Sequence, residues 1–482
     1  MTAEAYQADL HRPALSLPQT YTGEILATLK LAWPLVLTQI ASMAIGVTDV
    51  LMVGRLGPEA LAATALGLSL FYMPLMFGFG LSSALSPFLS QVVGADPYGL
   101  DPARRSPETS AALRRHFRTG LWSVFLASLP ALAILSFSET LFLALGQDPA
   151  LSKVATHYVW ALMPAIPFML MIGVMRNLFS ALSRPRPALI VTLIWIVINI
   201  GLNWVFIYGN LGVPALGVVG AGIASTLATL IGVAMMAICV LLHPATRPIE
   251  PFKGVLTFEK REIGHFMRVG LPIGLTLFFE GAVFNAALWL VGLFGTAQLA
   301  GHQIAINVAS VTFQIPLGVA FASTVRVGYA AGANDWNAVR RAGHVGQAVA
   351  FMFMGVTAFI MWTWPYEIAG LYLDLDDPKT LPAAAFAAQY LAIAAIFQLA
   401  DGQQVAAAYG LRGLKDTSLP MWIAGVSYWV IGFPACLALG FWTPLEGQGV
   451  WLGLALALVF AAALMTWRFE FLTRKHRLGA DA

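Results

Sequence analysis

Charge and cysteine are both scarce in this sequence. Only 11% of the 482 residues are charged, whereas 59% are hydrophobic and the mean hydropathy is +0.76. Because soluble domains carry about twice this charged fraction, a soluble globular protein is excluded. The two cysteines, Cys239 and Cys436, both lie in apolar runs, which indicates neither a disulfide framework nor a metal site. The first 20 residues do not place a basic segment before an apolar core, so we expect no cleaved signal peptide.

Motifs of enzymes and of nucleic-acid-binding modules are also missing. The sequence has no HExxH, no phosphate-binding GxxxxGK[ST] and no GxSxG, and its eight histidines show no metal-ligand spacing. We therefore expect no catalytic residue, no cofactor and no nucleic-acid partner. Without a nucleotide site, any uphill transport has to draw its energy from an ion gradient.

Long apolar runs dominate the chain instead. Twelve segments are long enough to cross a bilayer, which takes roughly 20 helical residues. They cover residues 28–53, 62–91, 117–138, 155–182, 188–209, 218–242, 267–292, 301–327, 345–365, 383–410, 419–441 and 448–469. This pattern predicts an all-α polytopic membrane protein with twelve transmembrane helices. The second segment holds Pro74 and Pro87, so we expect it to bend.

The distribution of Lys and Arg predicts the orientation. If the N-terminus is inside, 23 of the 27 Lys and Arg residues fall in inner loops and termini. Three lie outside (Arg55, Lys153 and Lys379), and Arg176 lies within the fourth segment. Inner loops of membrane proteins carry such an excess. We therefore expect a multi-pass protein of a bacterial cytoplasmic (inner) membrane with both termini in the cytoplasm.

The sequence contains an internal repeat with a shift of 238 residues. Residues 31–95 align with 269–333 without a gap, and 13 of the 65 positions are identical, mainly glycine, proline and small residues. Six apolar segments separate the copies, so each copy enters the membrane from the same side, as in the parallel repeats of secondary transporters. The predicted organisation is a cytoplasmic segment (1–24), an N-terminal six-helix lobe (25–242), a cytoplasmic linker (243–266), a C-terminal six-helix lobe (267–470) and a cytoplasmic tail (471–482).

Three acids lie deep inside predicted helices, namely Asp49, Glu280 and Asp401. A carboxylate in hydrocarbon is costly, so it needs a partner or a proton. No Lys or Arg lies nearby in the sequence, which makes an exchangeable Na⁺ or H⁺ the natural partner; the alternative is a carboxylate that faces a water-filled vestibule. In the repeat Asp49 aligns with Ala287, and Glu280 aligns with Ser42. The scaffold is therefore duplicated, but the charge is not.

Amide and hydroxyl side chains accompany the acids. Asn199 and Asn203 are four residues apart, so they share one helix face, and both fall in the same half of the membrane as Asp49. Their oxygens could coordinate a cation, or the two residues could join neighbouring helices by hydrogen bonds. Four further polar residues are candidates to line a cavity or, as the alternative, to join neighbouring helices by hydrogen bonds. They are Thr226, Gln39, Gln314 and Asn285.

These features together resemble the multidrug and toxic compound extrusion (MATE) family and its NorM-like bacterial branch. The resemblance covers residues 25 to 470. The stretches that carry it are WPLVLTQ…DVLMVGRLG (33–57), PFLSQVVGA (87–95), NIGLNW (199–204), LPIGLTLFFEGAVF (271–284), VRVGYAAGAND (325–335) and LRGLKDTSLP (411–420).

The resemblance implies a secondary active multidrug efflux antiporter. Such a protein exports organic cations and drugs in exchange for Na⁺ or H⁺ by alternating access of its two lobes. By the same resemblance, the cation-coupling residues are Asp49, Glu280, Asp401, Asn199 and Asn203. Na⁺ would bind at Glu280 and Asp401, or at Asp49 with Asn199 and Asn203. The implied partners are small cationic drugs and the lipid bilayer, and the implied state is a monomer.

One position departs from the family, and two other functions remain open. Some family members have a tyrosine one turn before the acid of the tenth helix, where this sequence has Phe397. A flippase for lipid-linked precursors would favour arginines over acids in the membrane core. An intramembrane enzyme would need a nucleophile with a base, or metal ligands, at membrane depth.

Overall fold

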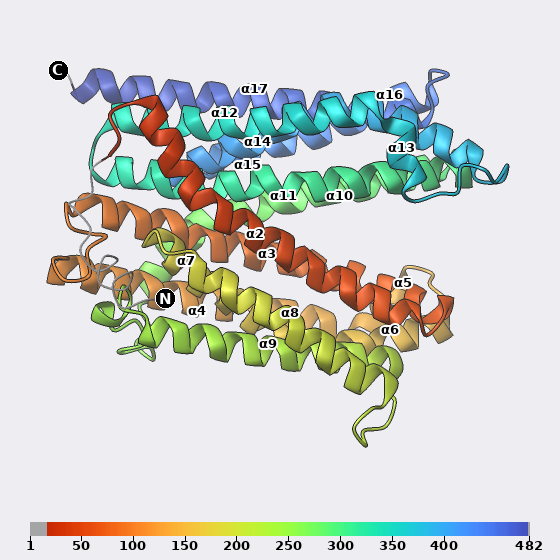
Figure 1. Ribbon diagram of the computed structural model, residues 1–482, viewed down its shortest axis with the longest axis horizontal. Helices are drawn as coiled ribbons and strands as arrows, with labels where there is room; N and C mark the ends of the chain where they lie inside the picture. The colour runs from red at the N-terminus through yellow and green to blue at the C-terminus, as the bar shows by residue number, and fades with distance from the viewer. Residues whose placement is uncertain (1–16, 481–482) are drawn as a thin grey trace. The chain divides into compact units, whose positions relative to one another are not determined.

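The structure is a computed structural model that describes residues 17–480, so Arg12 and the rest of the predicted segment up to residue 16 lie outside it. The described chain is all-helical (Figure 1). Its elements are α2 (Tyr21–Gly54), α3 (Pro58–Ala95), α4 (Pro107–Ser136), α5 (Ser138–Ala144), α6 (Pro149–Leu162), α7 (Ala165–Ala181), α8 (Arg186–Tyr208), α9 (Gly217–Leu242), η1 (Arg247–Ile249), α10 (Lys260–Gly292), α11 (Thr296–Gly332), α12 (Trp336–Thr363), α13 (Pro365–Gly370), α14 (Leu381–Gly413), α15 (Ser418–Gly425), η2 (Val426–Gly432), α16 (Phe433–Phe441) and α17 (Gly447–Ala480).

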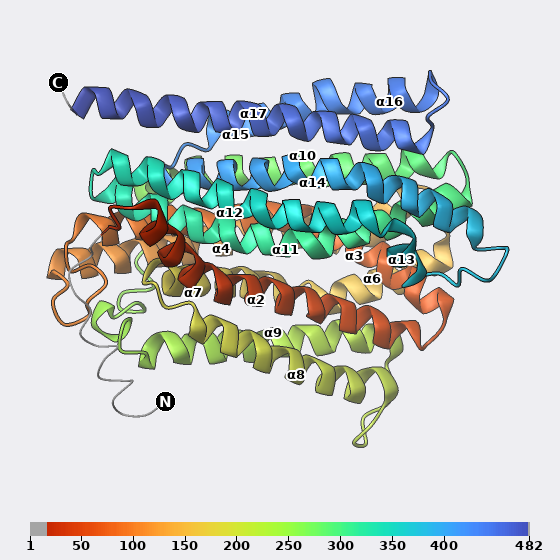
Figure 2. The same ribbon diagram turned by 45° about the horizontal axis from the view of Figure 1, so that its top comes forward.

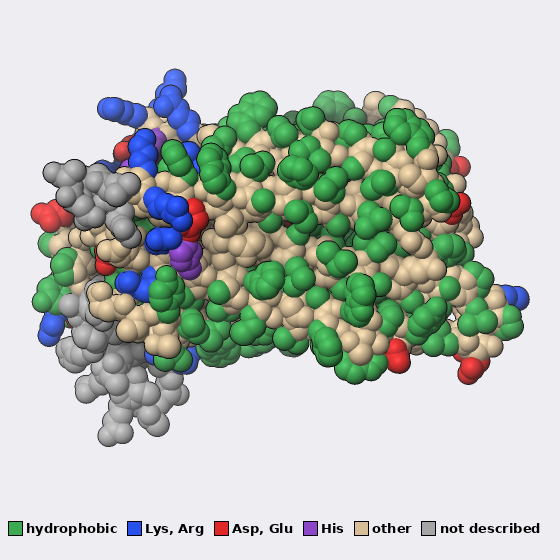
Figure 3. All heavy atoms as spheres, turned by 90° about the horizontal axis from the view of Figure 1, so that it is seen from above, with side chains coloured by type: hydrophobic (Ala, Val, Ile, Leu, Met, Phe, Trp, Pro, Cys, Tyr) green, Lys and Arg blue, Asp and Glu red, His purple; other side chains and the backbone are tan. Residues whose placement is uncertain are grey.

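The twelve predicted membrane spans are confirmed. Within the described residues, eleven spans are long and apolar enough to cross a bilayer, and the pair α6–α7 makes a twelfth. In each unit of the chain the long helices run side by side (Figure 2). Large apolar side chains such as Leu51 and Trp289 are 65% and 75% exposed, and hydrophobic side chains cover the middle of the face drawn in Figure 3. Such a surface suits contact with lipid.

The fourth predicted span is not one straight helix, which corrects the expectation for residues 155–182. It breaks after Leu162 into α6 and α7, which meet at 45°. The cause is Pro164, which stands at the N-cap of α7, because proline has no N–H and its ring clashes with the preceding turn. By contrast, α3 continues as one helix through Pro74 and Pro87.

The chain divides into two compact units. In the described residues, unit 1 is Leu37–Leu275, and unit 2 combines Leu17–Val36 with the chain from Thr276 onward. The first half of α2 thus belongs to unit 2, and the first half of α10 belongs to unit 1. The lobes predicted at 25–242 and 267–470 divide α2 and α10 differently, and their boundaries stay a prediction.

Matching glycine contacts appear in both units. In unit 1, a β-carbon at Gly80 of α3 would lie 2.2 Å from the backbone nitrogen of Gly274 in α10. In unit 2, a β-carbon at Gly318 of α11 would lie 2.7 Å from the backbone of Val36 in α2. Gly80 aligns with Gly318 in the repeat, and Val36 aligns with Gly274. The repeat therefore preserves glycine where two backbones approach too closely for any side chain.

A buried ion pair fixes the start of α2 within unit 2. The Arg326 guanidinium donates from Nε and Nη2 to the two carboxylate oxygens of Glu24, each at 2.7 Å. Glu24 is 1% exposed and Arg326 8%. This two-pronged geometry is the strongest form of a side-chain ion pair. It holds the first turn of α2 against the C-terminal end of α11.

The eleventh predicted span, 419–441, contains a local change of helix type. It begins as α15, passes through the π-helical segment η2, and ends as α16. Single π-helical turns are rare and often mark functional sites. The segment η2 carries Tyr428, the one tyrosine of this span.

Candidate functional site

In unit 1, Asp49 of α2 lies in a closed cluster with residues from α8 and α9. Its Oδ1 accepts a hydrogen bond from Asn203 Nδ2 at 2.5 Å, and its Oδ2 accepts one from Ser225 Oγ at 2.9 Å. Asn203 Nδ2 also donates to Asn199 Oδ1 at 3.2 Å, and Asn199 Nδ2 donates to Ser225 Oγ at 3.3 Å. The spacing of the two asparagines places both amides on the α8 face that meets Asp49.

Every hydrogen-bond donor of this cluster bonds to the Asp49 carboxylate or to a residue that does. They are neutral amides and a hydroxyl, and no Lys or Arg of the described residues pairs with Asp49. Asn199 and Asn203 are 1% and 0% exposed, whereas Asp49 is half-buried. The Oδ1 atom of Asn203 is buried without a hydrogen-bond partner. The cluster thus combines an acid, whose charge is balanced only by dipoles, with a spare oxygen that suits a cation.

Ser225 was not predicted from the sequence, which favoured its neighbour Thr226. The Thr226 hydroxyl instead donates to the backbone carbonyls of Ala161 and Leu162, at 2.7 and 3.4 Å. These carbonyls end α6 at the break before Pro164, so they lack helical partners. Thr226 therefore satisfies the broken helix, and Ser225 takes the place beside Asp49. Two adjacent hydroxyls in an apolar helix were the available signal, but their spacing did not say which one faces α2.

In unit 2, Glu280 of α10 and Asp401 of α14 lie on two helices that meet through the rings of Phe284 and Phe397. Phe284 follows Glu280 by one turn on α10, and Phe397 precedes Asp401 by one turn on α14. The two rings are in contact, with centroids 5.9 Å apart and an edge-to-face angle of 72°. Phe397 is 2% exposed. The carboxylates interact electrostatically across the two helices.

The Asp401 side of this pair holds several buried oxygens without hydrogen-bond partners. They are Asp401 Oδ1, Gln404 Oε1 and the Tyr428 hydroxyl, on residues that are 6%, 2% and 1% exposed. Tyr428 interacts electrostatically with both carboxylates. Just before η2, Gly425 at the end of α15 lies against α10, where a β-carbon would be 3.2 Å from the Phe279 ring. A phenolic hydroxyl therefore interacts electrostatically with the acids even though Phe397 carries none.

Arg412 is a further residue that sequence spacing did not connect with the acids. It ends α14, is 6% exposed, and its guanidinium lies 3.9 Å from the ring centroid of Tyr409. It attracts the Glu280 carboxylate electrostatically. No Lys or Arg lies near Glu280 in the sequence, and the interaction with Arg412 arises because folding brings the C-terminal end of α14 toward α10.

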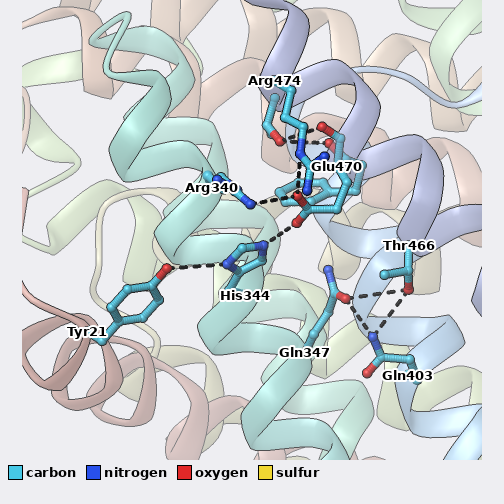
Figure 4. Close-up of polar contacts among 10 residues, drawn as sticks. Tyr21, Arg340, His344, Gln347, Gln403, Thr466, Glu470 and Arg474 are labelled. Carbon is cyan, nitrogen blue, oxygen red and sulfur yellow. Dashed lines mark hydrogen bonds and ion pairs between the residues drawn. The ribbon is translucent and has the colours of Figure 1, made fainter. Parts of the chain in front are cut away.

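A polar network joins α12, α14 and α17 (Figure 4). Gln403 Nε2 donates to Gln347 Oε1 at 2.6 Å and to Thr466 Oγ1 at 3.2 Å. Further toward the end of α17, Glu470 pairs with Arg340 at 3.0 Å and with His344. The hydrogen bonds of Gln403 fix α14 against α12 and α17, and so fix the position of Asp401, two residues before it.

Two of the three remaining predicted polar residues make local contacts. Asn285 is exposed and donates to Gly281 O at 2.8 Å within α10, and Gln314 donates to Ser310 O at 3.1 Å within α11. Gln39 is half-buried in the unit 1 part of α2. None of the three joins the Asp49 cluster through a hydrogen bond of the described residues.

Comparison with known proteins extends these observations. The model of the MatE family matches residues 34–205 and 272–437. A relative from Mesorhizobium japonicum named "Probable multidrug resistance protein NorM" is 41% identical over 92% of this chain and 93% of its own length. One of the same name from Rhodopseudomonas palustris is 39% identical over 95% and 94%.

Solved structures share the fold. A MATE protein in a bent conformation superimposes with a TM-score of 0.83 at 18% identity, covering 95% of this chain and 97% of that one. A eukaryotic MATE transporter superimposes with a TM-score of 0.81 at 20% identity, covering 95% and 99%. The matches of sequence and fold agree with each other along nearly the whole chain, and the resemblance to the NorM-like branch is confirmed. The chain therefore belongs to the MATE family, whose members are membrane transporters and not enzymes.

Proposed function

We propose that this protein is a secondary active multidrug efflux antiporter that exports organic cations in exchange for Na⁺ or H⁺. The observation that carries the proposal is the Asp49 cluster, in which neutral donors alone hold a carboxylate inside an apolar helix bundle. A buried charge without a fixed counter-ion is costly. That cost is removed whenever an exchangeable cation binds, so the occupancy of the site follows the ion gradient.

The acid pair of unit 2 supports the same argument. Glu280 and Asp401 repel each other, so at most one of their two charges is balanced by Arg412. The free oxygens of Asp401, Gln404 and Tyr428 are hard ligands, which suit a hard cation such as Na⁺, whereas a proton needs only the Asp401 carboxylate. We therefore assign cation coupling to Asp49, Asn199 and Asn203 in one lobe and to Glu280 and Asp401 in the other.

Exchange follows if the coupling ion and the drug compete for this negative charge. A ligand shifts the balance between two conformations only through its different affinity for them. Binding of the ion from the outside favours release of the cationic drug outward, and the lobes then alternate to the inward-facing state. The relatives carry multidrug resistance in their names, which supports drugs as the substrate class.

The membrane orientation belongs to the same proposal. On the face drawn in Figure 3, the Lys and Arg side chains lie mainly at one end of the helices. That end holds the chain segments with the predicted excess of positive charge, and such an excess faces the cytoplasm. We assign the protein to the bacterial cytoplasmic membrane, as a monomer with both termini inside.

Efflux of a cationic dye from proteoliposomes, with Na⁺ and H⁺ gradients imposed separately, tests the proposal. Efflux should follow one of the two gradients and stop in Asp49→Asn, Glu280→Gln or Asp401→Asn. The matched control is Asp376→Asn, the same change at an exposed acid outside the helix bundle, which should keep wild-type efflux. Wild-type efflux from all three core variants would overturn the assignment.

A further inference from the structure

The segment that joins η1 to α10, residues 250–259, is docked on α4 within unit 1. Three side chains at four-residue intervals along α4, Arg114, Arg118 and Trp122, donate hydrogen bonds to backbone carbonyls of this segment and of the residue before it. In the same order, the accepting oxygens belong to Ile249 (2.7 Å), Gly254 (3.3 Å) and Val255 (2.8 Å). Because residues four apart share one helix face, the docked segment follows that face of α4 from turn to turn.

This path leads the docked segment toward the membrane. Arg114 and Trp122 are eight residues apart, which is about 12 Å of helix. Arg114 precedes the predicted span 117–138, whereas Trp122 lies inside it. Tryptophan side chains favour the boundary between hydrocarbon and headgroups. The part of the docked segment that contacts Trp122 therefore lies at the depth of the headgroups, on the side that we assign to the cytoplasm.

The docked segment presents large apolar side chains at this depth. Leu256 is 85% exposed and Phe258 is 50% exposed. The ring of Phe258 packs edge-to-face against Trp122, with centroids 5.5 Å apart. Gly254 has φ +67°, and its carbonyl accepts a hydrogen bond from Thr257 N–H at 2.9 Å, which closes the turn around Leu256. Exposed apolar groups on a turn of fixed geometry are typical of a contact with membrane.

Positive charge adjoins these apolar side chains. Lys260 and Arg261 begin α10 and are exposed. Neither has a hydrogen-bond or ion-pair partner in the part of the chain that the structure describes. The acids on either side, Glu259 and Glu262, pair instead with arginines of α4. Cations beside an apolar tip match the anionic headgroups of an inner leaflet.

We propose that the docked segment anchors unit 1 to anionic phospholipids of the inner leaflet. Leu256 and Phe258 insert among the lipids, and Lys260 and Arg261 bind the headgroups. The connection between η1 and α10 is then an element of the membrane surface and not a free cytoplasmic loop. Because α10 begins directly after the docked segment, the lipid also fixes the start of the helix that carries Glu280.

A spin label at position 256 tests the proposal in the full chain, with Cys239 and Cys436 replaced by alanine. The vesicles contain phosphatidylglycerol and phosphatidylcholine in equal amounts. There the label on Leu256→Cys should be more accessible to molecular oxygen, which concentrates in the bilayer, than to a water-soluble nickel complex. The matched control is a label on Lys253→Cys, in the same segment, where the native side chain pairs with Glu250 at the cytoplasmic end of the path. This label should be more accessible to the nickel complex.

The charges of the lipid and of the protein are then varied separately. In vesicles of phosphatidylcholine alone, the label at 256 should become more accessible to the nickel complex. The same change should occur in the anionic vesicles when Lys260→Gln and Arg261→Gln are combined. Each cation near an anionic surface contributes about fivefold in affinity, so this pair contributes about 25-fold. Lys475→Gln, which removes an exposed lysine of α17, should have no effect.

Two results would overturn the proposal. One is a label at 256 that is as accessible to the nickel complex as the label at 253. The other is insertion that is equal in both kinds of vesicle and unchanged by loss of the two cations, because apolar contact without headgroup recognition would then explain it. The measurement involves no transport, so its outcome is independent of whether the antiport assignment holds.

Discussion

Replacing Ser225 with alanine removes one hydrogen bond from the Asp49 carboxylate and leaves the fold of α9 intact. The lost bond, 2.9 Å long, goes to a charged group, and such bonds contribute about 1.5–3 kcal/mol. At about 1.4 kcal/mol for each tenfold change, the apparent affinity for the coupling cation should shift about 10- to 150-fold. The direction identifies the ion. A proton needs only the carboxylate and binds more tightly when a competing donor is lost, whereas Na⁺ loses an oxygen ligand and binds more weakly.

The neighbouring hydroxyl provides the control. Thr226→Val keeps the side-chain volume and removes only the bonds to the carbonyls of Ala161 and Leu162, so it should lower the melting temperature but not change the ion dependence. Dye efflux from proteoliposomes, measured over a series of Na⁺ concentrations and a series of pH values, reports both variants. The reasoning is refuted if Ser225→Ala shows wild-type ion dependence while Thr226→Val shows a shifted one.

Three further changes test other parts of the structure. Tyr428→Phe removes the buried hydroxyl that interacts electrostatically with both acids of unit 2 and should lower efflux about tenfold, whereas Tyr409→Phe on α14 should not. Gly80→Ala should cost about 1–3 kcal/mol and lower the melting temperature, because its methyl group would lie 2.2 Å from the α10 backbone; Gly46→Ala, with no atom within 4 Å, should not. Burial alone would raise the pKa of Asp96, but hydrogen bonds from two backbone N–H groups and two hydroxyls lower it below 3.8. A lowered folded-state pKa means that the carboxylate stabilises the fold above about pH 4 and loses this effect as the pH falls through the folded value. Asp96→Asn should therefore lower the melting temperature at pH 7, and the difference from wild type should close in acid.

The spans were predictable because each apolar run must bury its own backbone hydrogen bonds in lipid. Runs of this length leave the chain one solution, the helix, and the structure has a helix at each of the twelve. The break at Pro164 and the π-helical segment around Tyr428 were not predictable, because an apolar run looks the same whether its helix is straight, broken or locally wide. Partners on other helices, such as Thr226, decide which form is stable.

Some residues of the two sites were predictable from the sequence, and others were not. Spacing alone showed that Asn199 and Asn203 share a face, and rarity alone singled out Asp49, Glu280 and Asp401, since an acid in a membrane helix has few uses. The residues that complete both sites lie far away in the sequence. Ser225 and Tyr428 are ordinary residues in their own helices. Only the hydrogen bonds of Ser225 with α2 and α8, and the electrostatic interaction of Tyr428 with Glu280 and Asp401, give them a role.

The sequence by itself determined the class of protein, the helices, the repeat and the acids, because these depend on composition and on local hydrogen bonding. Tertiary structure alone decided which hydroxyl meets Asp49, that Arg412 reaches Glu280, and that α2 and α10 are shared between the two units. It also decided the glycine contacts that explain why Gly80 and Gly318 are preserved in the repeat. The physical reason is that helix packing depends on the close approach of surfaces that are distant in the sequence. No single segment determines the distance or the rotation between two helices.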